Sequence, residues 1–282
     1  MNKLLCIFLF LGVGFCFHGY TQVTPCATEV STSQQTLEIS IDLPENDSVK
    51  STTYLHKTVS LVFHVVKDLS GNTTISEQFI NNAIAGANII FGEVGLNFQN
   101  CRYNTIENHQ YDVINKSTTE SKLVSKHNMP SRLNVYIVSI LYDSDGNQTC
   151  GYTYMPADEK DILFLSKQCF LNDSLHLAHQ LGHVFNLYGT HIEDFGKETV
   201  GDNDCSHTGD RCCDTPADPN LSGLVDENCT YMGEMVDENG EFYVPSVSNL
   251  MSFSNRNCRC QLTPDQYKRV IHAYKNYKKY LW

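Results

Sequence analysis

Apolar residues follow two different spacings in the first part of the chain after residue 56. Between residues 59 and 65 every second residue is apolar, which predicts a β-strand because neighbouring side chains of a strand point to opposite faces. Between residues 76 and 92 apolar residues recur every three or four positions, which predicts a helix. Ser76 is a typical N-cap and Gly92 a typical helix end, so both boundaries have a local cause.

Similar patterns predict the remaining elements. Short apolar runs predict strands over residues 96–103, 132–141, 150–155 and 161–166. A helix is expected at about 173–186, and a last helix begins at Pro264, a favoured first-turn residue after Thr263. Residues 189–248 are rich in Gly, Pro, Asp and Cys and have little periodic apolar pattern. Disulfides or metal are expected to hold this loop-rich region.

The amino terminus has the composition of an export signal. Lys3 precedes a nearly unbroken apolar run over residues 4–17, which is too short to span a bilayer. We therefore expect a signal peptide over residues 1–21. Residues 22–55 are polar and rich in Ser and Thr, and are expected to form a pro-segment or N-terminal extension outside the core. The folded domain is then expected to span residues 56–282.

Charge and cysteine content narrow the class of protein. The formal net charge is −12, which disfavours nucleic acid and anionic lipid and suits calcium or basic substrates. After the leader no apolar run is long enough to cross a membrane, so a secreted chain without membrane insertion is expected. Ten of the 12 cysteines follow the leader and crowd toward the C-terminal third, and in an exported chain they predict a disulfide framework.

The segment most informative about chemistry contains His179 and His183. Histidines four residues apart lie on the same face of a helix, where both imidazoles can bind one zinc ion. In zinc peptidases of this pattern a Glu next to the first His takes a proton from the metal-bound water, and here that position is Gln180. His176, one turn earlier on the same helix, is expected to face solvent.

Three further motifs follow the histidines in order. They are Gly209-Asp-Arg-Cys-Cys-Asp-Thr-Pro, Asn249-Leu-Met-Ser-Phe253 and Cys258-Arg-Cys-Gln-Leu-Thr-Pro-Asp-Gln266. Together with the histidine helix they resemble the pappalysin-like metzincins, a family of zinc metallopeptidases, over roughly residues 57–280. The resemblance implies an α/β (α+β) metzincin-like fold. It consists of a twisted five-stranded mixed sheet with a backing helix and an active-site helix, then a loop-rich, disulfide-bonded C-terminal half with a Met-turn and a C-terminal helix.

The resemblance also implies roles for individual residues. Met251 would form the hydrophobic floor of the metal site, and residues 150–155 would be the edge strand along which an extended peptide or protein ligand binds. Two disulfides are implied, Cys205–Cys213 and Cys229–Cys258. Cys26 resembles the family's pro-segment cysteine, whose thiolate caps the zinc. A plain disulfide, for example with Cys101, is the competing interpretation of Cys26.

Three departures from the family pattern fall at chemical positions. Gln180 replaces the general base, Gly189 replaces the third zinc-binding His, and Phe253 replaces the Tyr that ends the Met-turn. His191, two residues beyond the lost ligand, is a candidate replacement, and a cleft-wall His is the alternative. Several independent changes argue against a miscopied active enzyme, because His to Gly alone needs two nucleotide changes.

An acidic loop offers oxygen ligands of the kind that calcium prefers. The candidate calcium ligands are Asp202, Asp204, Asp210 and Asp214. A solvated run of charges is the alternative interpretation of this loop.

Two functional hypotheses follow from these patterns. The first is a secreted pappalysin-family zinc metallopeptidase homologue that is catalytically impaired and retains a peptide-binding cleft. The second is an active zinc-dependent endopeptidase whose site has been rebuilt with His191. They differ in whether the native chain holds zinc tightly and cleaves a denatured protein.

Overall fold

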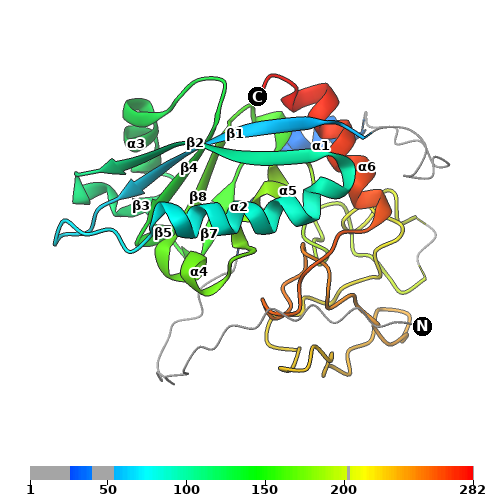
Figure 1. The fold of residues 1–282 in the computed structure, drawn as a ribbon. Helices are drawn as coiled ribbons and strands as arrows, with labels where there is room; N and C mark the ends of the chain where they lie inside the picture. The colour runs from blue at the N-terminus through cyan, green and yellow to red at the C-terminus, as the bar shows by residue number, and fades with distance from the viewer. Residues whose placement is uncertain (1–25, 40–53, 202–203, 282) are drawn as a thin grey trace.

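The computed structural model describes residues 26–39, 54–201 and 204–281 (Figure 1). The predicted signal peptide, the remainder of residues 22–55 and Asp202 lie outside the described residues. The central layer is a sheet with the strand order β2-β1-β4-β8-β7. Its strands are β2 (Leu96–Ile106), β1 (Lys57–Val66), β4 (Leu133–Val138), β8 (Ile162–Ser166) and β7 (Gly151–Thr153).

The sheet is mixed because only its last pair is antiparallel. The pairs β1–β2, β1–β4 and β4–β8 are parallel, whereas β7 runs antiparallel to β8. Parallel strands buried on both faces are typically continuous runs of apolar residues, as β4 and β8 are. The predicted strand at residues 150–155 lies at the edge of the sheet, as β7. The five-stranded mixed sheet is therefore confirmed.

Helices cover both faces of the sheet, and Figure 1 shows α2 running across it. One core contains Leu61, Val135 and Leu165 from the sheet with residues of α2, α5 and α6, and the second core lies on the opposite face with Leu123 of α3. The α-helices are α1 (Thr32–Ile39), α2 (Glu77–Phe91), α3 (Glu120–His127), α4 (Lys167–Asn172), α5 (His176–Val184) and α6 (Pro264–Ala273). Short helical turns occur at η1 (Gly92–Val94), η2 (His109–Tyr111), η3 (Pro156–Asp158) and η4 (Tyr274–Lys278).

Local capping explains the helix boundaries. Ser76 Oγ accepts a hydrogen bond from the Phe79 amide, which caps α2 as predicted. Thr263 and Gln266 form a reciprocal capping box at the start of α6. The prediction of a helix over residues 173–186 was too long at both ends. Helix α5 begins at His176 and ends at Val184, because Asn186 turns the chain in a left-handed conformation with φ of 70°.

The prediction of one strand over residues 132–141 was wrong. The chain leaves the main sheet at Ser139 and enters a second sheet, ordered β3-β5-β6, formed by β3 (Val113–Asn115), β5 (Ile140–Tyr142) and β6 (Gln148–Thr149). Asp112 causes this break. Its backbone carbonyl accepts hydrogen bonds from the amides of Ser139 and Ile140, and its carboxylate accepts one from the Ser139 hydroxyl. The Lys167 ammonium lies 2.6 Å from the same carboxylate.

Lys167→Met is expected to lower the free energy of unfolding by about 3 kcal/mol, because it leaves the buried Asp112 carboxylate without its cation. Denaturant unfolding with the disulfides intact measures the change. The matched control is Lys67→Met, whose ion pair with Glu107 is exposed to solvent and is expected to contribute at most about 1 kcal/mol. Equal losses in the two variants would contradict a structural role for the buried pair.

Irregular chain and disulfides form the lower part of the molecule, drawn from yellow to orange in Figure 1. Between α5 and α6 the described residues form only isolated β-bridges. Disulfides join Cys205 to Cys213 and Cys229 to Cys258, the two pairs that the family resemblance implies. A third disulfide, Cys150–Cys169, ties β7 to α4 and could not be paired from sequence. No helix among the described residues is long and apolar enough to cross a bilayer.

Candidate metal centre

Helix α5 places His179 and His183 one turn apart in the interior, where 1% and 5% of their surfaces are exposed. Each ring is oriented by a backbone carbonyl, because Nδ1 lies 2.8 Å from Leu250 O in His179 and 2.8 Å from Leu187 O in His183. A neutral ring that donates its Nδ1 proton in this way keeps an unprotonated Nε2. The two Nε2 atoms face each other 3.3 Å apart. Two lone pairs at this separation need a cation or a proton between them.

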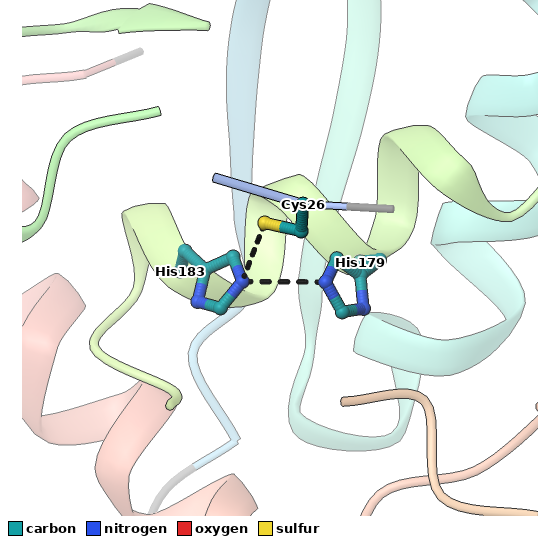
Figure 2. Close-up of side chains that lie close together, drawn as sticks. All are labelled: Cys26, His179 and His183. Carbon is teal, nitrogen blue, oxygen red and sulfur yellow. Dashed lines mark hydrogen bonds between the residues drawn. The ribbon is translucent and has the colours of Figure 1, made fainter. Parts of the chain in front are cut away.

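Cys26 of the N-terminal segment completes the cluster (Figure 2). Its Sγ lies 3.4 Å from His183 Nε2. Within the described part of the chain, Cys26, His179 and His183 form the only group of three or more metal-ligand side chains whose ligand atoms all lie within 4.8 Å of one another. Burial opposes ionisation of the thiol, but its closeness to His183 and hydrogen bonds with both histidines hold the pKa of Cys26 well below its usual range. The thiolate is the form that binds metal.

The donor set fits zinc in type and in spacing. Zinc–nitrogen bonds of about 2.0–2.1 Å at tetrahedral angles separate two nitrogen ligands by about 3.3 Å, and a zinc–sulfur bond of about 2.3 Å separates sulfur from nitrogen by about 3.6 Å. The observed separations are 3.3 Å between the nitrogens and 3.4 Å between Cys26 Sγ and His183 Nε2. Three protein ligands of this kind leave one coordination position for another group.

Gln180 lies next to the cluster and is fully buried. Its Nε2 donates a hydrogen bond to Cys26 Sγ at 3.1 Å, and its Oε1 accepts one from the Thr28 hydroxyl at 3.2 Å. An amide cannot take a proton from water near neutral pH, so Gln180 cannot act as a general base. It can stabilise a thiolate, which an ionised Glu at the same position would repel.

Gly189, where the sequence comparison predicted a lost ligand, has no side chain, and His191 lies beside it. A Cβ added to Gly189 would lie 2.9 Å from Cε1 of His191, so the His191 ring occupies the space next to Gly189. The His191 ring packs against that of Phe253 with centroids 4.1 Å apart and a tilt of 44° between the ring planes. Its buried Nδ1 has no hydrogen-bond partner among the described residues, and burial lowers the pKa of His191 to about 4. His191 is nevertheless not part of the cluster in which the ligand atoms of Cys26, His179 and His183 all lie within 4.8 Å of one another.

The Met251 side chain packs against α5 at Gly182. Its Sδ would lie 2.5 Å from a Cβ added to Gly182, so only glycine permits this close approach. The Met251 amide donates to Asn249 Oδ1 at 2.9 Å, and the carbonyl of Met251 accepts a hydrogen bond from the Thr190 amide at 3.3 Å. These bonds join the turn around Met251 to the chain that follows α5.

Gly182→Ala is expected to lower the free energy of unfolding by about 1–3 kcal/mol, because the added methyl group overpacks the buried Met251 side chain. The matched control is Gly86→Ala in α2, where the added Cβ would lie 3.2 Å from a Leu175 methyl group and the helix gains from alanine. We expect the control to stay within about 1 kcal/mol of the native chain in the same unfolding experiment. A control as unstable as the Gly182 variant would mean that helical glycines in general are needed here.

The N-terminal segment lies across a cleft of about 490 Å³ beside the histidines. The cleft is lined by Cys26, Thr28, Val30, Met155, His183, Tyr188, Gly189, His191, Ile192, Glu193, Asp194, Asp218, Pro219, Asn220 and Phe253. Gln34 of α1 anchors the segment, since its fully buried side chain donates to Asn186 Oδ1 at 2.6 Å and to the Tyr188 hydroxyl at 2.8 Å. Residues 22–55 were expected to lie outside the core, but the structure shows that the side chain of Gln34 in this segment is buried.

Two predictions about neighbouring residues were also wrong. His176 is not solvated: it is 4% exposed, and its Nε2 lies 3.2 Å from the carbonyl oxygen of Cys150. The sequence alone could not show this, because the contact depends on β7 lying beside α5. The alternative of a disulfide between Cys26 and Cys101 is also wrong, since both are unpaired and Cys101 is exposed.

The described carboxylates of the predicted calcium set do not converge. Asp204 is bonded to His207, Asp214 accepts a hydrogen bond from the Asp265 amide, and Asp210 is buried beneath Thr215. Burial raises the pKa of Asp210 to about 7. Among the described residues these three are not part of any group of ligand atoms within 4.8 Å.

Comparisons with known proteins agree with this fold. No protein-family model matches the chain. An extracellular metalloprotease of Arthroderma gypseum is 24% identical over 228 residues, which cover 76% of this chain and 71% of that protein. Mirolysin in complex with compound 9 has a TM-score of 0.57 at 16% identity, covering 82% of this chain and 96% of the mirolysin chain. Mature mirolysin of Tannerella forsythia in complex with a cleaved peptide has a TM-score of 0.53 at 17% identity, covering 82% and 98%.

These similarities relate the chain to metalloproteases and show that it has the fold of mirolysin. The predicted metzincin-like architecture is confirmed at the level of the fold. The three disulfides and the extracellular relative confirm the prediction of secretion.

Proposed function

We propose that this chain is a secreted, zinc-binding homologue of the pappalysin-like metallopeptidases with impaired catalysis and a retained peptide-binding cleft. The observation that carries the proposal is Gln180. It occupies the position of the general base next to two converged histidines, and its amide donates a hydrogen bond to the Cys26 thiolate. Zinc at this position would polarise a peptide carbonyl and acidify bound water, but an amide cannot accept the proton that hydrolysis releases.

The other two departures act in the same direction. Gly189 supplies no ligand, and Phe253 has no hydroxyl to stabilise the negative charge that develops on a carbonyl oxygen during peptide hydrolysis. A base, a ligand and a hydrogen-bond donor are thus missing together, while the buried histidines and the cleft remain. This combination favours binding of an extended peptide over its cleavage.

We infer that residues 22–55 are a pro-segment, that residues 1–21 are a signal peptide, and that residues 56–282 form the peptidase-like domain. Three contacts support the assignment of the segment that contains residues 26–39 as a pro-segment. Cys26 lies against the histidines, Gln34 reaches the end of α5, and the Ala27 amide donates to Gly151 O of the edge strand at 3.0 Å. With the segment in this position, the Cys26 thiolate would hold zinc together with His179 and His183.

An active zinc endopeptidase is the second candidate function, and one observation favours it. The buried Nδ1 of His191 has no hydrogen-bond partner among the described residues and belongs to a ring that lines the cleft beside His183. If Cys26 left the site, His191 would be the side chain available to take its place as the third ligand of a zinc ion. Calcium in the acidic loop stays a prediction from the sequence.

Zinc content and proteolysis of the full chain test the proposal. We expect about one tightly held zinc per chain after excess metal is removed, and loss of that zinc in His179→Ala. We expect no cleavage of a denatured protein above the background of the same His179→Ala variant. Cleavage that the native chain performs and a chelator stops would overturn the impaired-enzyme proposal and favour the second candidate. Absence of bound zinc in the native chain would overturn both.

A further inference from the structure

We propose that Lys116, framed by Tyr152 and Tyr154, forms a subsite beside edge strand β7 that selects an acidic side chain of a bound peptide. The inference rests on the proposed peptide-binding cleft and adds its substrate class. It assigns a binding role to the ammonium group of Lys116, which lies outside the metal centre. The chain as a whole is acidic, with a formal net charge of −12.

The N-terminal segment shows how an extended chain lies along β7. The amide of Ala27 donates to Gly151 O at 3.0 Å, and the amide of Thr153 donates to the Thr28 hydroxyl at 3.1 Å. Residues 27 and 28 therefore follow the free edge of the sheet, the position in which a peptide adds itself as a further strand. The next residue, Glu29, is the first whose side chain extends past the metal centre to a charged partner.

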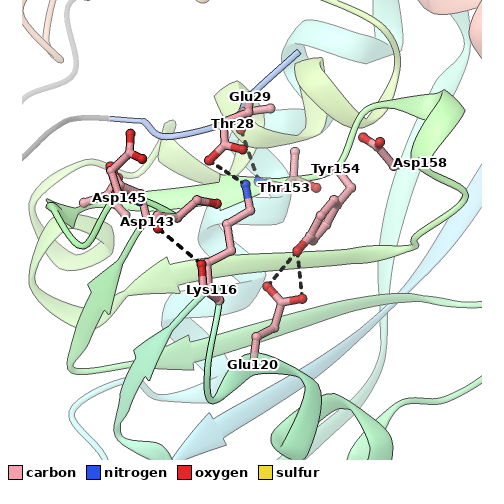
Figure 3. A network of polar contacts seen from close by, with 12 residues as sticks. Thr28, Glu29, Lys116, Glu120, Asp143, Asp145, Thr153, Tyr154 and Asp158 are labelled. Carbon is pink, nitrogen blue, oxygen red and sulfur yellow. Dashed lines mark hydrogen bonds and ion pairs between the residues drawn. The ribbon is translucent and has the colours of Figure 1, made fainter. Parts of the chain in front are cut away.

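Lys116 is that partner (Figure 3). Its Nζ lies 3.0 Å from Glu29 Oε1, and the Lys116 side chain is 9% exposed. The ammonium lies 5.2 Å from the ring centroid of Tyr152 and 5.3 Å from that of Tyr154. Aromatic faces attract a cation and exclude water around it, which strengthens its attraction for a carboxylate. The Glu29 side chain is half-exposed, whereas that of Lys116 is almost buried, so the surrounding protein fixes the position of the lysine and not that of the glutamate.

Contacts with Glu120 and Lys160 hold the Tyr154 ring in its position beside Lys116. The Tyr154 hydroxyl donates to both oxygens of Glu120, at 2.8 and 2.9 Å, and Glu120 is 5% exposed. The ring of Tyr154 also faces Lys160, whose Nζ lies 4.0 Å from its centroid. The Glu120 carboxylate is thus hydrogen-bonded to Tyr154. The nearby Asp143 carboxylate accepts hydrogen bonds from the amides of Asp145 and Asn147. Glu29 is the acid that pairs with Lys116.

The segment defines the ligand by position. An extended peptide that follows the same path would place an Asp or Glu three residues after the residue that faces the histidines, as Glu29 follows Cys26. A neutral amide at that position would leave the Lys116 ammonium without its charge partner. The subsite therefore selects peptides by charge at one position, independently of whether the metal centre cleaves them.

Peptide binding to an opened form of the full chain tests the subsite. In the variant Cys26→Ser with Glu29→Gln and Gln34→Ala, the segment loses its contacts with the histidines, with the Lys116 ammonium and with Asn186. The probe is a fluorescent eight-residue peptide with the sequence of residues 24–31, handled without oxygen, compared by anisotropy with the same peptide carrying Gln in place of its Glu. We expect the Glu peptide to bind about fivefold more tightly than the Gln peptide.

Lys116→Met in this background is expected to abolish the preference and to leave binding of the Gln peptide unchanged. Lys160→Met is the matched control, since it removes a neighbouring lysine that has no contact with Glu29, and it is expected to keep the preference. Lys116→Glu is expected to reverse the preference toward a peptide with Lys at the same position.

The outcomes separate the two proposals. Tight binding of both peptides with no preference would overturn the subsite and leave the peptide-binding cleft standing. A preference that disappears with Lys160→Met but persists with Lys116→Met would also overturn the subsite. No binding of either peptide would overturn the peptide-binding cleft, and with it the subsite that rests on that cleft.

Discussion

Cys26→Ser is expected to lower the affinity of the full chain for zinc by about a hundredfold. Structural zinc sites with four ligands bind with about 10–16 kcal/mol, or about 3 kcal/mol for each ligand, which corresponds to about two orders of magnitude. Here Cys26 is one of three converged ligands, and serine does not supply a thiolate. Competition with a chromogenic chelator measures the affinity, and Cys101→Ser, which removes an exposed unpaired thiol elsewhere, serves as the control.

The size of this loss also decides the role of His191. If His191 takes the place of the thiolate, Cys26→Ser alone loses little affinity, and the combination with His191→Phe loses the full hundredfold. If His191 is only part of the cleft wall, the second substitution adds nothing. An unchanged affinity in both variants would mean that Cys26 and His191 are not ligands, and that His179 and His183 bind zinc with groups other than these.

The fold could be predicted from the sequence to the extent that local patterns decide it. Strand β1 and helix α2 follow from periodic apolar residues and from the Ser76 cap. The break at Ser139 could not be predicted, because it is caused by Asp112 and Lys167, which are distant in sequence and contribute hydrogen bonds and charge. A continuous β-branched run gives no sign that a buried carboxylate will divide it between two sheets.

The closeness of the two histidines in the candidate site was predictable, but the contacts of the N-terminal segment around them were not. The spacing of His179 and His183 places both on one face of a helix, and the structure shows them 3.3 Å apart at Nε2. The hydrogen bonds of Gln180 to Cys26 and Thr28 could not be inferred, since they join residues more than 150 positions apart. Gln34 was also missed, because a single polar residue in a polar segment carries no sign of burial.

Adding a general base and a third histidine to the site is expected to create peptidase activity, which the native chain is proposed to lack. The variant carries Gln180→Glu and Gly189→His, with Cys26→Ser and Gln34→Ala to free the cleft. It also needs His191→Ala, because a Cβ at position 189 would lie 2.9 Å from the His191 ring. Gly189 is not among the residues with positive φ, so its backbone conformation accepts a side chain. Cleavage of a denatured protein, with and without a chelator, is the measurement.

The matched control is the same variant with Gln180 retained, which has the third histidine but no base. We expect the Glu form to cleave about 10²–10⁴ times faster than this control, the range that a positioned general base contributes. If both forms bind zinc and only the Glu form cleaves, the native chain is impaired by its missing base. If both bind zinc and neither cleaves, the next variant to test adds Phe253→Tyr, which supplies the hydroxyl hydrogen-bond donor that Phe253 lacks. Cleavage at equal rates would show that Gln180 is not what limits the native site, since another group must then accept the proton.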